Sequence, residues 1–267
     1  MASFSVVNNI GSVNAQSKLY ETNIGLSRTL ARLSSGLRIN QSGDDAAGLA
    51  VANKFRSDVA ILNVGVRNAN DGLSALQIAD GALDNISRLL DRAATLATQS
   101  ATGTTTNTSR TVLNEEFQAV LSEIDREAGI ASLTTATSYS IYISNDGANG
   151  TVNVSFGAAT ASTLGISSAT IATSAGASSA ITSLQAAITA LGSVQGSVGS
   201  AQNRLSFAVS IAQSQIVNKT AAQSRIRDAN IAEESANLTR YNILTQSGLA
   251  SLAQANQTTS SVLSLLR

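Results

Sequence analysis

Three adjacent carboxylate pairs are the side chains in this sequence most suited to acid–base or metal chemistry: Asp44–Asp45, Glu115–Glu116 and Glu233–Glu234. The chain of 267 residues contains no His and no Cys, so the commonest general base and the thiolate metal ligands are absent. Adjacent acids at a helix start stabilise the helix dipole, which is the role we expect for the first pair. The two glutamate pairs are interpreted as solvated helix faces. We therefore predict no catalytic, cofactor-binding or metal-binding residues, and no enzyme activity.

The composition also argues against nucleic-acid and membrane binding. Seventeen basic residues balance 17 acidic residues, so bulk electrostatic attraction to acidic partners is not indicated. No run approaches the roughly 18 apolar residues of a membrane span, and residues 1–20 do not resemble a cleavable secretory signal. The absence of proline suits long helices, because an interior proline costs about 3 kcal/mol.

One long helix is the element around which the others must be arranged. From residue 55 to 97, apolar residues recur at alternating steps of four and three, the pattern of a helix with one narrow apolar seam. We expect this helix to begin at Asp44 and to end at Ser100. Its predicted seam is Phe55, Val59, Leu62, Val66, Ala69, Leu73, Leu76, Asp80, Leu83, Ser87, Leu90, Ala94 and Ala97.

Such a seam needs a partner, because a lone helix gains most of its stability from packing. The same spacing returns over Ile181, Leu184, Ile188, Leu191, Gln195, Val198, Gln202, Leu205, Val209, Ala212 and Ile216. From the two helices we predict a buried core seam formed by Phe55, Leu62, Leu73, Leu76, Leu83, Leu191, Leu205 and Ile216. Glycines at 65, 72 and 81 are expected to allow another helix to approach closely.

Shorter elements lie between the two long helices. A third helix carries Leu113, Phe117, Val120 and Ile124 and stops near Gly129. Residues 132–203 contain a single charged residue, Asp146, and alternating apolar residues on either side of it predict a β-hairpin at about 138–157.

The two ends of the chain are also predicted to be helical, over residues 4–34 and after Asp228. Their apolar positions form what we call the terminal seam: Leu26, Leu30, Leu33, Leu238, Tyr241, Leu252, Val262 and Leu266. The predicted fold is therefore dominated by α-helix, as a long antiparallel bundle or coiled coil with a small β-hairpin. We divide it into a terminal domain (1–43 and 221–267) and a core rod domain (44–220).

Six segments carry a resemblance to bacterial flagellin, in the order that the family shows. They cover the two end regions, roughly residues 1–130 and 195–267. The segments are Leu33–Asn40 (LSSGLRIN), Asp44–Gly48 (DDAAG), Arg67–Gly72 (RNANDG), Ser224–Asn230 (SRIRDAN), Leu252–Gln257 (LAQANQ) and Val262–Arg267 (VLSLLR). The middle of the chain departs from the family pattern, because it has room only for the hairpin and not for large outer domains.

The resemblance implies a structural subunit of the bacterial flagellar filament that self-assembles into a hollow helical polymer for motility. It implies that the terminal seam mediates polymerisation, with terminal helices that become ordered on assembly. It also implies secretion to the extracellular flagellum through the flagellar export apparatus with an export chaperone, and contact with hook-associated and cap proteins. No cofactor is implied.

Three alternatives stay open at this point. The hook–filament junction protein shares similar terminal segments, although the full motif set and the ending Leu-Leu-Arg favour a filament subunit. A protease, which some flagellins carry, would need a His-Glu-x-x-His helix, and this chain has no His. A free coiled-coil adaptor would not polymerise.

The resemblance further implies a surface recognised by Toll-like receptor 5, formed by Arg92, Leu96 and Glu116. Arg92 and Leu96 are four residues apart and off the predicted seam, so we expect both to point outward. The commoner family pattern has a second Arg and a Glu where this sequence has Ala94 and Thr95. Receptor binding weaker than that of the full pattern is therefore predicted.

Overall fold

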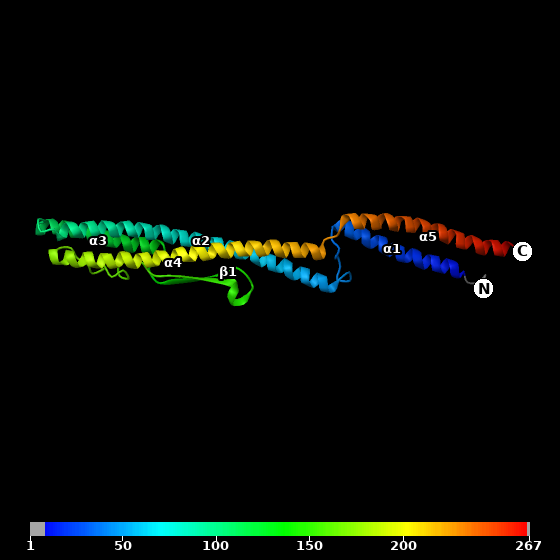
Figure 1. Cartoon of the computed structure of the whole chain (residues 1–267), viewed down its shortest axis with the longest axis horizontal. Helices are drawn as coiled ribbons and strands as arrows, with labels where there is room; N and C mark the ends of the chain where they lie inside the picture. The colour runs from blue at the N-terminus through cyan, green and yellow to red at the C-terminus, as the bar shows by residue number, and fades with distance from the viewer. Residues whose placement is uncertain (1–8, 266–267) are drawn as a thin grey trace. The chain divides into compact units, whose positions relative to one another are not determined.

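The computed structural model describes residues 9–265, and only the backbone for residues 148–149 and 259–265 (Figure 1). The predicted fold class, an α-dominated antiparallel bundle with a small hairpin, is confirmed. The predicted helix start at residue 4 lies outside the described residues. The elements are α1 (Ile10–Ser35), α2 (Ala46–Ala101), α3 (Asn107–Ile130), β1 (Thr137–Tyr142), a 3₁₀ turn (Gly147–Gly150), β2 (Thr151–Phe156), α4 (Ser174–Arg227) and α5 (Ile231–Leu265).

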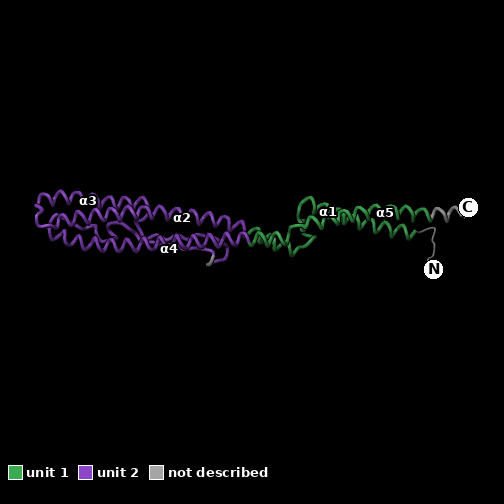
Figure 2. Tube along the Cα trace, turned by 45° about the horizontal axis from the view of Figure 1, so that its top comes forward, with its two compact units in different colours: residues 1–57, 218–267 green, residues 58–217 purple. Residues whose placement is uncertain are grey.

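Two compact units divide the chain, and each is described by itself (Figure 2). The terminal unit comprises residues 1–57 and 218–267, and the core unit comprises residues 58–217. Helices α2 and α4 each contribute to both units. The division into a polymerisation domain (1–43 and 221–267) and a rod domain (44–220) concerns assembly, and it stays a prediction.

In the terminal unit, α1 and α5 pack side by side, and glycines make room for bulky side chains of the opposite helix. A Cβ at Gly25 would lie 2.6 Å from the Tyr241 ring, and a Cβ at Gly248 would lie 3.2 Å from Leu19. Helix α1 ends at Gly36, whose φ of 71° is the left-handed conformation that favours glycine at a helix C-terminus.

In the core unit, α2, α3 and α4 run alongside one another around one continuous apolar core (Figures 1 and 2). Of the predicted core seam, Phe55, Leu73 and Ile216 are half-buried. The other five members are buried: Leu62, Leu76, Leu83, Leu191 and Leu205.

The predicted seam is wrong at every second position of α2 beyond Leu76. The buried residues there are Ala79, Ile86 and Ala93, whereas Asp80 is exposed. On α4, Ala187 and Ala201 are similarly buried in place of Ile188 and Gln202. The repeat is three-then-four rather than four-then-three, and four of the five misassigned core layers on the two helices hold an alanine (Ala79, Ala93, Ala187 and Ala201), the fifth being Ile86. Because alanine is small, it lets two helix backbones approach closely. At these four positions the alanine therefore faces the core, and the neighbouring residue that the sequence spacing predicted does not.

The hairpin is the nearest neighbour of α2 at two of the glycines where another helix was expected, although at Gly72 a Cβ would also lie 3.6 Å from Leu205 on α4. A Cβ at Gly65 would lie 1.9 Å from the Ile143 carbonyl oxygen, and one at Gly72 would lie 2.3 Å from Ile141 Cδ1. The third glycine, Gly81, faces open space. Strands β1 and β2 pair antiparallel from Thr137–Phe156 to Tyr142–Thr151, so the predicted hairpin at about 138–157 is present.

Candidate functional site

The first carboxylate pair organises the connector between α1 and α2. Asp44 Oδ2 accepts hydrogen bonds from the backbone N–H groups of Gln41 and Asn40, both at 3.1 Å. These two bonds, with a smaller contribution from the positive charge of Arg32, lower the pKa of Asp44. Asp45 Oδ1 accepts from the Gly48 N–H at 2.9 Å at the start of α2. Both acids therefore fix backbone geometry.

The Glu233–Glu234 pair is not a solvated helix face, because Glu234 is only 8% exposed. Its Oε1 lies 3.4 Å from Arg32 Nη1, and Arg32 Nη2 lies 3.9 Å from Asp44 Oδ1. This cluster ties α1, the connector and α5 together. The spacing of leucines did not predict this cluster. The sequence does carry a signal for it, because an arginine lies near the end of α1 and a glutamate near the start of α5.

The terminal seam is only partly covered within the chain. Leu26, Leu33, Leu238, Tyr241 and Leu252 are half-buried, whereas Leu30 is exposed. The side chain of Val262 and the whole of Leu266 lie outside the described residues.

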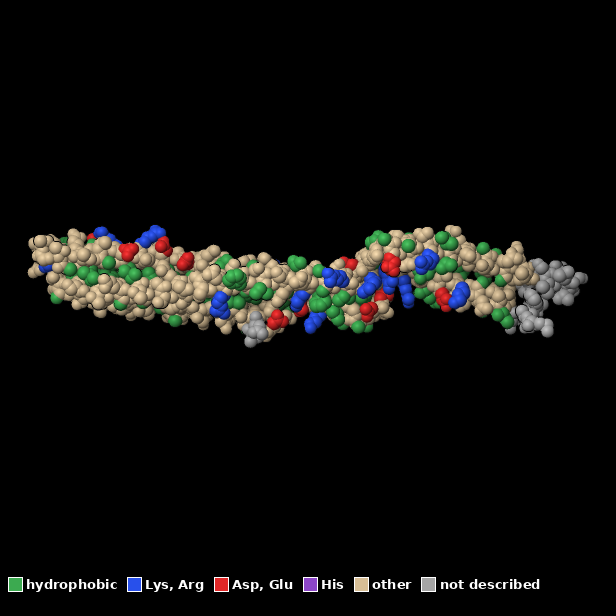
Figure 3. Space-filling view, in the orientation of Figure 1, with side chains coloured by type: hydrophobic (Ala, Val, Ile, Leu, Met, Phe, Trp, Pro, Cys, Tyr) green, Lys and Arg blue, Asp and Glu red, His purple; other side chains and the backbone are tan. Residues whose placement is uncertain are grey.

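Large apolar side chains also point outward from both terminal helices (Figure 3). The buried side chains among the described residues of α1 and α5 are Thr29 and Glu234, which are polar. The exposed apolar residues on these helices are Ile10, Val13, Tyr20, Ile24, Leu30, Ile231, Ile243, Leu244 and Leu249. An apolar surface this extensive is typical of a site that packs against another protein.

The predicted receptor surface is divided between exposed and buried residues. Arg92 on α2 and Glu116 on α3 are both exposed and form an ion pair, with Arg92 Nε 3.0 Å from Glu116 Oε1. Leu96 is 1% exposed and belongs to the core, so the expectation that it points outward is wrong. The cause is the wrong assignment of core positions on α2. Ala93 and Ala97 face the core, and Leu96 lies on the same face of the helix.

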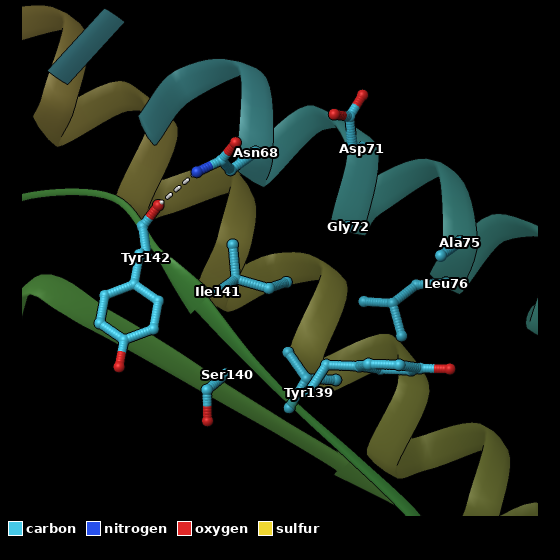
Figure 4. Close-up of a pocket in the computed structure, with 10 residues that line it drawn as sticks. Asn68, Asp71, Gly72, Ala75, Leu76, Tyr139, Ser140, Ile141 and Tyr142 are labelled. Carbon is cyan, nitrogen blue, oxygen red and sulfur yellow. Dashed lines mark hydrogen bonds between the residues drawn. The ribbon is translucent and has the colours of Figure 1, made fainter. Parts of the chain in front are cut away.

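A pocket of about 350 Å³ lies between α2 and β1 (Figure 4). Gly72, Leu76, Tyr139 and Ile141 are among the residues that line it, as is Asp71. Sequence analysis placed the glycine at a close contact, but it did not predict the cavity.

Arg110 is a further buried charge that sequence analysis missed. Its Nε donates to the Ser100 carbonyl oxygen at 2.8 Å, and its Nη2 donates to the Thr102 carbonyl oxygen at 3.1 Å. A third bond, at 3.1 Å, joins Nη1 to Asn107 Oδ1. Arg110 therefore satisfies carbonyl groups at the C-terminus of α2, where a positive charge also favours the helix dipole.

Within residues 9–265, no group of three or more acidic, His or Cys residues is placed to hold a metal ion. None of the helices described there has the length and hydropathy of a membrane span.

Comparison with models of protein families shows to which family the chain belongs. The model of the bacterial flagellin N-terminal helical region matches residues 6–136, and that of the C-terminal helical region matches residues 181–266. The chain belongs to the bacterial flagellin family.

Relatives match this flagellin over nearly its whole length. The flagellar filament 33 kDa core protein of Treponema phagedenis is 36% identical over 281 residues, which cover 97% of this chain and 98% of that protein. Flagellin FlaB2 of Treponema pallidum shows the same identity and coverage. The flagellin of Halalkalibacterium halodurans is 35% identical over 254 residues, covering 90% and 91%.

These matches make this flagellin a structural subunit of the flagellar filament, as its terminal motifs predicted. The names of these relatives support the filament rather than the hook–filament junction. The family is a structural one, in line with the non-enzymatic role expected from the sequence.

Proposed function

We propose that this flagellin polymerises into a hollow helical filament for motility through its terminal domain (1–43 and 221–267). The observation that carries the proposal is the outward apolar surface of α1 and α5, which the chain itself leaves exposed. Covering this surface with neighbouring copies removes apolar area from water, at roughly 25 cal/mol per Å². The terminal helices then surround the central channel, and the rod domain (44–220) forms the outer wall.

Polymerisation of the purified chain in concentrated sulfate, which strengthens apolar burial, tests this proposal. We expect filaments, and we expect Ile243→Ser to raise the critical concentration because Ile243 is exposed on α5. Asn242→Ser, at the neighbouring exposed polar position, is the matched control and should polymerise as the wild type does. A wild-type chain that stays monomeric contradicts the proposal.

We also propose that the chain is secreted to the extracellular flagellum. Family membership supports export through the flagellar export apparatus with an export chaperone, and contact with hook-associated and cap proteins. Deleting the export apparatus should leave the chain inside the cell. Quantifying copies per flagellum separates a filament subunit, with very many copies, from a junction protein.

Recognition by Toll-like receptor 5 is a second proposed function, favoured by the exposed Arg92–Glu116 pair. Binding should be weaker than that of a flagellin with the full pattern, because Ala94 and Thr95 replace its Arg and Glu. The test compares receptor binding by wild-type, Arg92→Ala and Glu116→Ala monomers. Leu96→Ala is unsuitable alone, since it also removes a core side chain. Binding by both variants at wild-type strength contradicts the proposal.

A further inference from the structure

The contacts between α1 and α5 repeat along both helices (Figure 1). The helices run antiparallel, and successive contacts are about one heptad apart on each of them. These contacts are Gly11 with Ala255, Leu19 with Gly248, Gly25 with Tyr241, and Arg32 with Glu234. Because a slip of one heptad returns the same helix faces to each other, the faces alone do not fix the register of the pair.

Apolar packing discriminates weakly between such registers. Among the described residues of α1 and α5, the buried side chains are Thr29 and Glu234, which are polar. The apolar residues of these helices are half-buried or exposed, and the hydrophobic effect that acts on them is not directional. The Tyr241 ring against Gly25 adds some fit of shape. A polar contact is therefore the stronger source of discrimination, and Glu234 makes one.

The ion pair between Arg32 and Glu234 exists in one register only. Arg32 Nη1 lies 3.4 Å from Oε1 of the buried Glu234. A slip of one heptad brings Tyr241 or Arg227 opposite Arg32, and neither carries a negative charge. No cation then lies opposite Glu234. Separating the partners of a buried pair costs far more than the pair contributes, because a buried charge is left uncompensated.

The same pair is poorly built as a stabilising contact. Arg32 Nε and Glu234 Oε2 are buried, and neither forms a hydrogen bond with another residue in the part of the chain that the structure describes. Apolar side chains of similar size often stabilise a protein as well as such a pair does, or better. Buried polar residues of this kind are best attested as determinants of register in coiled coils.

Backbone contacts next to the pair hold the same ends of the two helices together. Leu37, just after α1, and Asp228, just before α5, form an isolated antiparallel bridge. Beside it, the Arg38 N–H donates to the Arg227 carbonyl oxygen at 2.6 Å. Every residue except proline has these backbone groups, so a slipped pairing could form similar bonds. The bridge therefore brings the helices together, and discrimination between registers is left to the side chains.

We propose that the Arg32–Glu234 pair fixes the register of α1 against α5. The pair acts by excluding pairings that are slipped by a heptad more than by stabilising the correct one. This inference rests on the assembly proposed above, because we expect the terminal helices to be ordered in the filament. One register is needed there, since identical copies in a symmetric polymer use the same surface.

The absence of cysteine from this chain allows the register to be read from engineered disulfides. Leu19→Cys with Gly248→Cys, and Gly11→Cys with Ala255→Cys, report the observed register, because each pair of Cβ atoms would lie 3.9 Å apart, as a disulfide requires. The same four positions recombined, as Leu19→Cys with Ala255→Cys and Gly11→Cys with Gly248→Cys, report a slip in either direction. Each reporter chain is copolymerised as a minor component with the wild type, so that oxidation links cysteines within one chain.

Removing both charges tests the proposal. Arg32→Met with Glu234→Met keeps long side chains that favour a helix, so this variant should enter filaments as the wild type does. We expect the yield of slipped disulfides, relative to those of the observed register, to rise at least about tenfold, because slipping no longer exposes an unpaired charge to an apolar site. Lys18→Met with Glu21→Met removes an exposed ion pair of α1 and is the matched control, which should leave the ratio unchanged.

The outcomes separate the register from assembly itself. If the wild type fails to polymerise, the proposed function fails. If the wild type polymerises and Arg32→Met with Glu234→Met leaves the disulfide ratio unchanged, or if the control raises it equally, the register inference alone is overturned. Exclusion of the Arg32→Met, Glu234→Met variant from filaments also overturns it, because the pair would then be needed for pairing of the helices in any register.

Discussion

At the residue scale, the leucines that face the core do more for the bundle than their exposed neighbours. Leu76 is buried among α2, α4 and the hairpin, whereas Gln77 is exposed. Leu76→Ala should lower the free energy of unfolding by roughly 2–5 kcal/mol, because it leaves a cavity. Gln77→Ala should change it by only a few tenths of a kcal/mol. Urea unfolding of both variants is the measurement, and equal shifts would mean that the register is misassigned.

The second residue-scale prediction concerns acid. The pKa of Asp44 is lowered chiefly by the Gln41 and Asn40 N–H groups, so the carboxylate form stabilises the folded connector. That contribution is fully present above the unfolded pKa near 3.8 and is lost as the pH falls through the lower folded value. The difference in melting temperature between wild type and Asp44→Asn should therefore be constant at neutral pH and shrink below about pH 4.

Asp125→Asn, which removes a carboxylate outside the connector, is the control for this pH series. Its carboxylate accepts one hydrogen bond, from the Ala161 N–H at 2.8 Å. A difference between wild type and Asp44→Asn that persists unchanged through the acid range would contradict the role assigned to Asp44.

At the element scale, two glycines of α2 should respond oppositely to the same substitution. Gly81→Ala adds a methyl group in open space and should stabilise the helix by up to about 1 kcal/mol. Gly65→Ala places a Cβ against the Ile143 carbonyl and should release the hairpin from α2. Amide exchange resolved along β1 and β2 is the measurement. Undisturbed protection of the hairpin in Gly65→Ala would show that this contact is not tight.

The elements were predictable from sequence to different degrees, for physical reasons. Apolar periodicity located all three core helices and the hairpin, because burial demands it. It did not separate Ala79 from Asp80 or Ala187 from Ile188 as core positions, since alanine gives a weak signal in a pattern dominated by leucine. Leu96 was misplaced for the same reason.

Polar sites were harder to predict than helices. Arg110 and the Arg32–Glu234 pair join residues that are distant along the chain or separated by a loop, so spacing alone does not bring them together. The hairpin pocket also depends on how β1 meets α2, which no local pattern specifies. The capping role of Asp45 was predictable because it is local to the helix start, whereas Asp44 binds backbone N–H groups of the preceding connector instead of the helix.

At the scale of the whole molecule, the two units differ in how much of their apolar surface the chain covers. The core unit has a continuous buried core of leucines, isoleucines and alanines. The described part of the terminal unit leaves most large apolar residues of α1 and α5 exposed or half-buried. We therefore expect the core unit to fold alone, and the terminal helices to gain their stability from neighbouring copies.

Amide hydrogen exchange on the chain before and after polymerisation tests this account most directly. We expect rapid exchange across residues 1–34 and 228–267 in the monomer and slow exchange there in the filament, with α2, α3 and α4 of the core unit slow in both states. Slow exchange across both terminal segments in the monomer would contradict coupled folding and assembly, and rapid exchange there in the filament would contradict their role as its assembly surface.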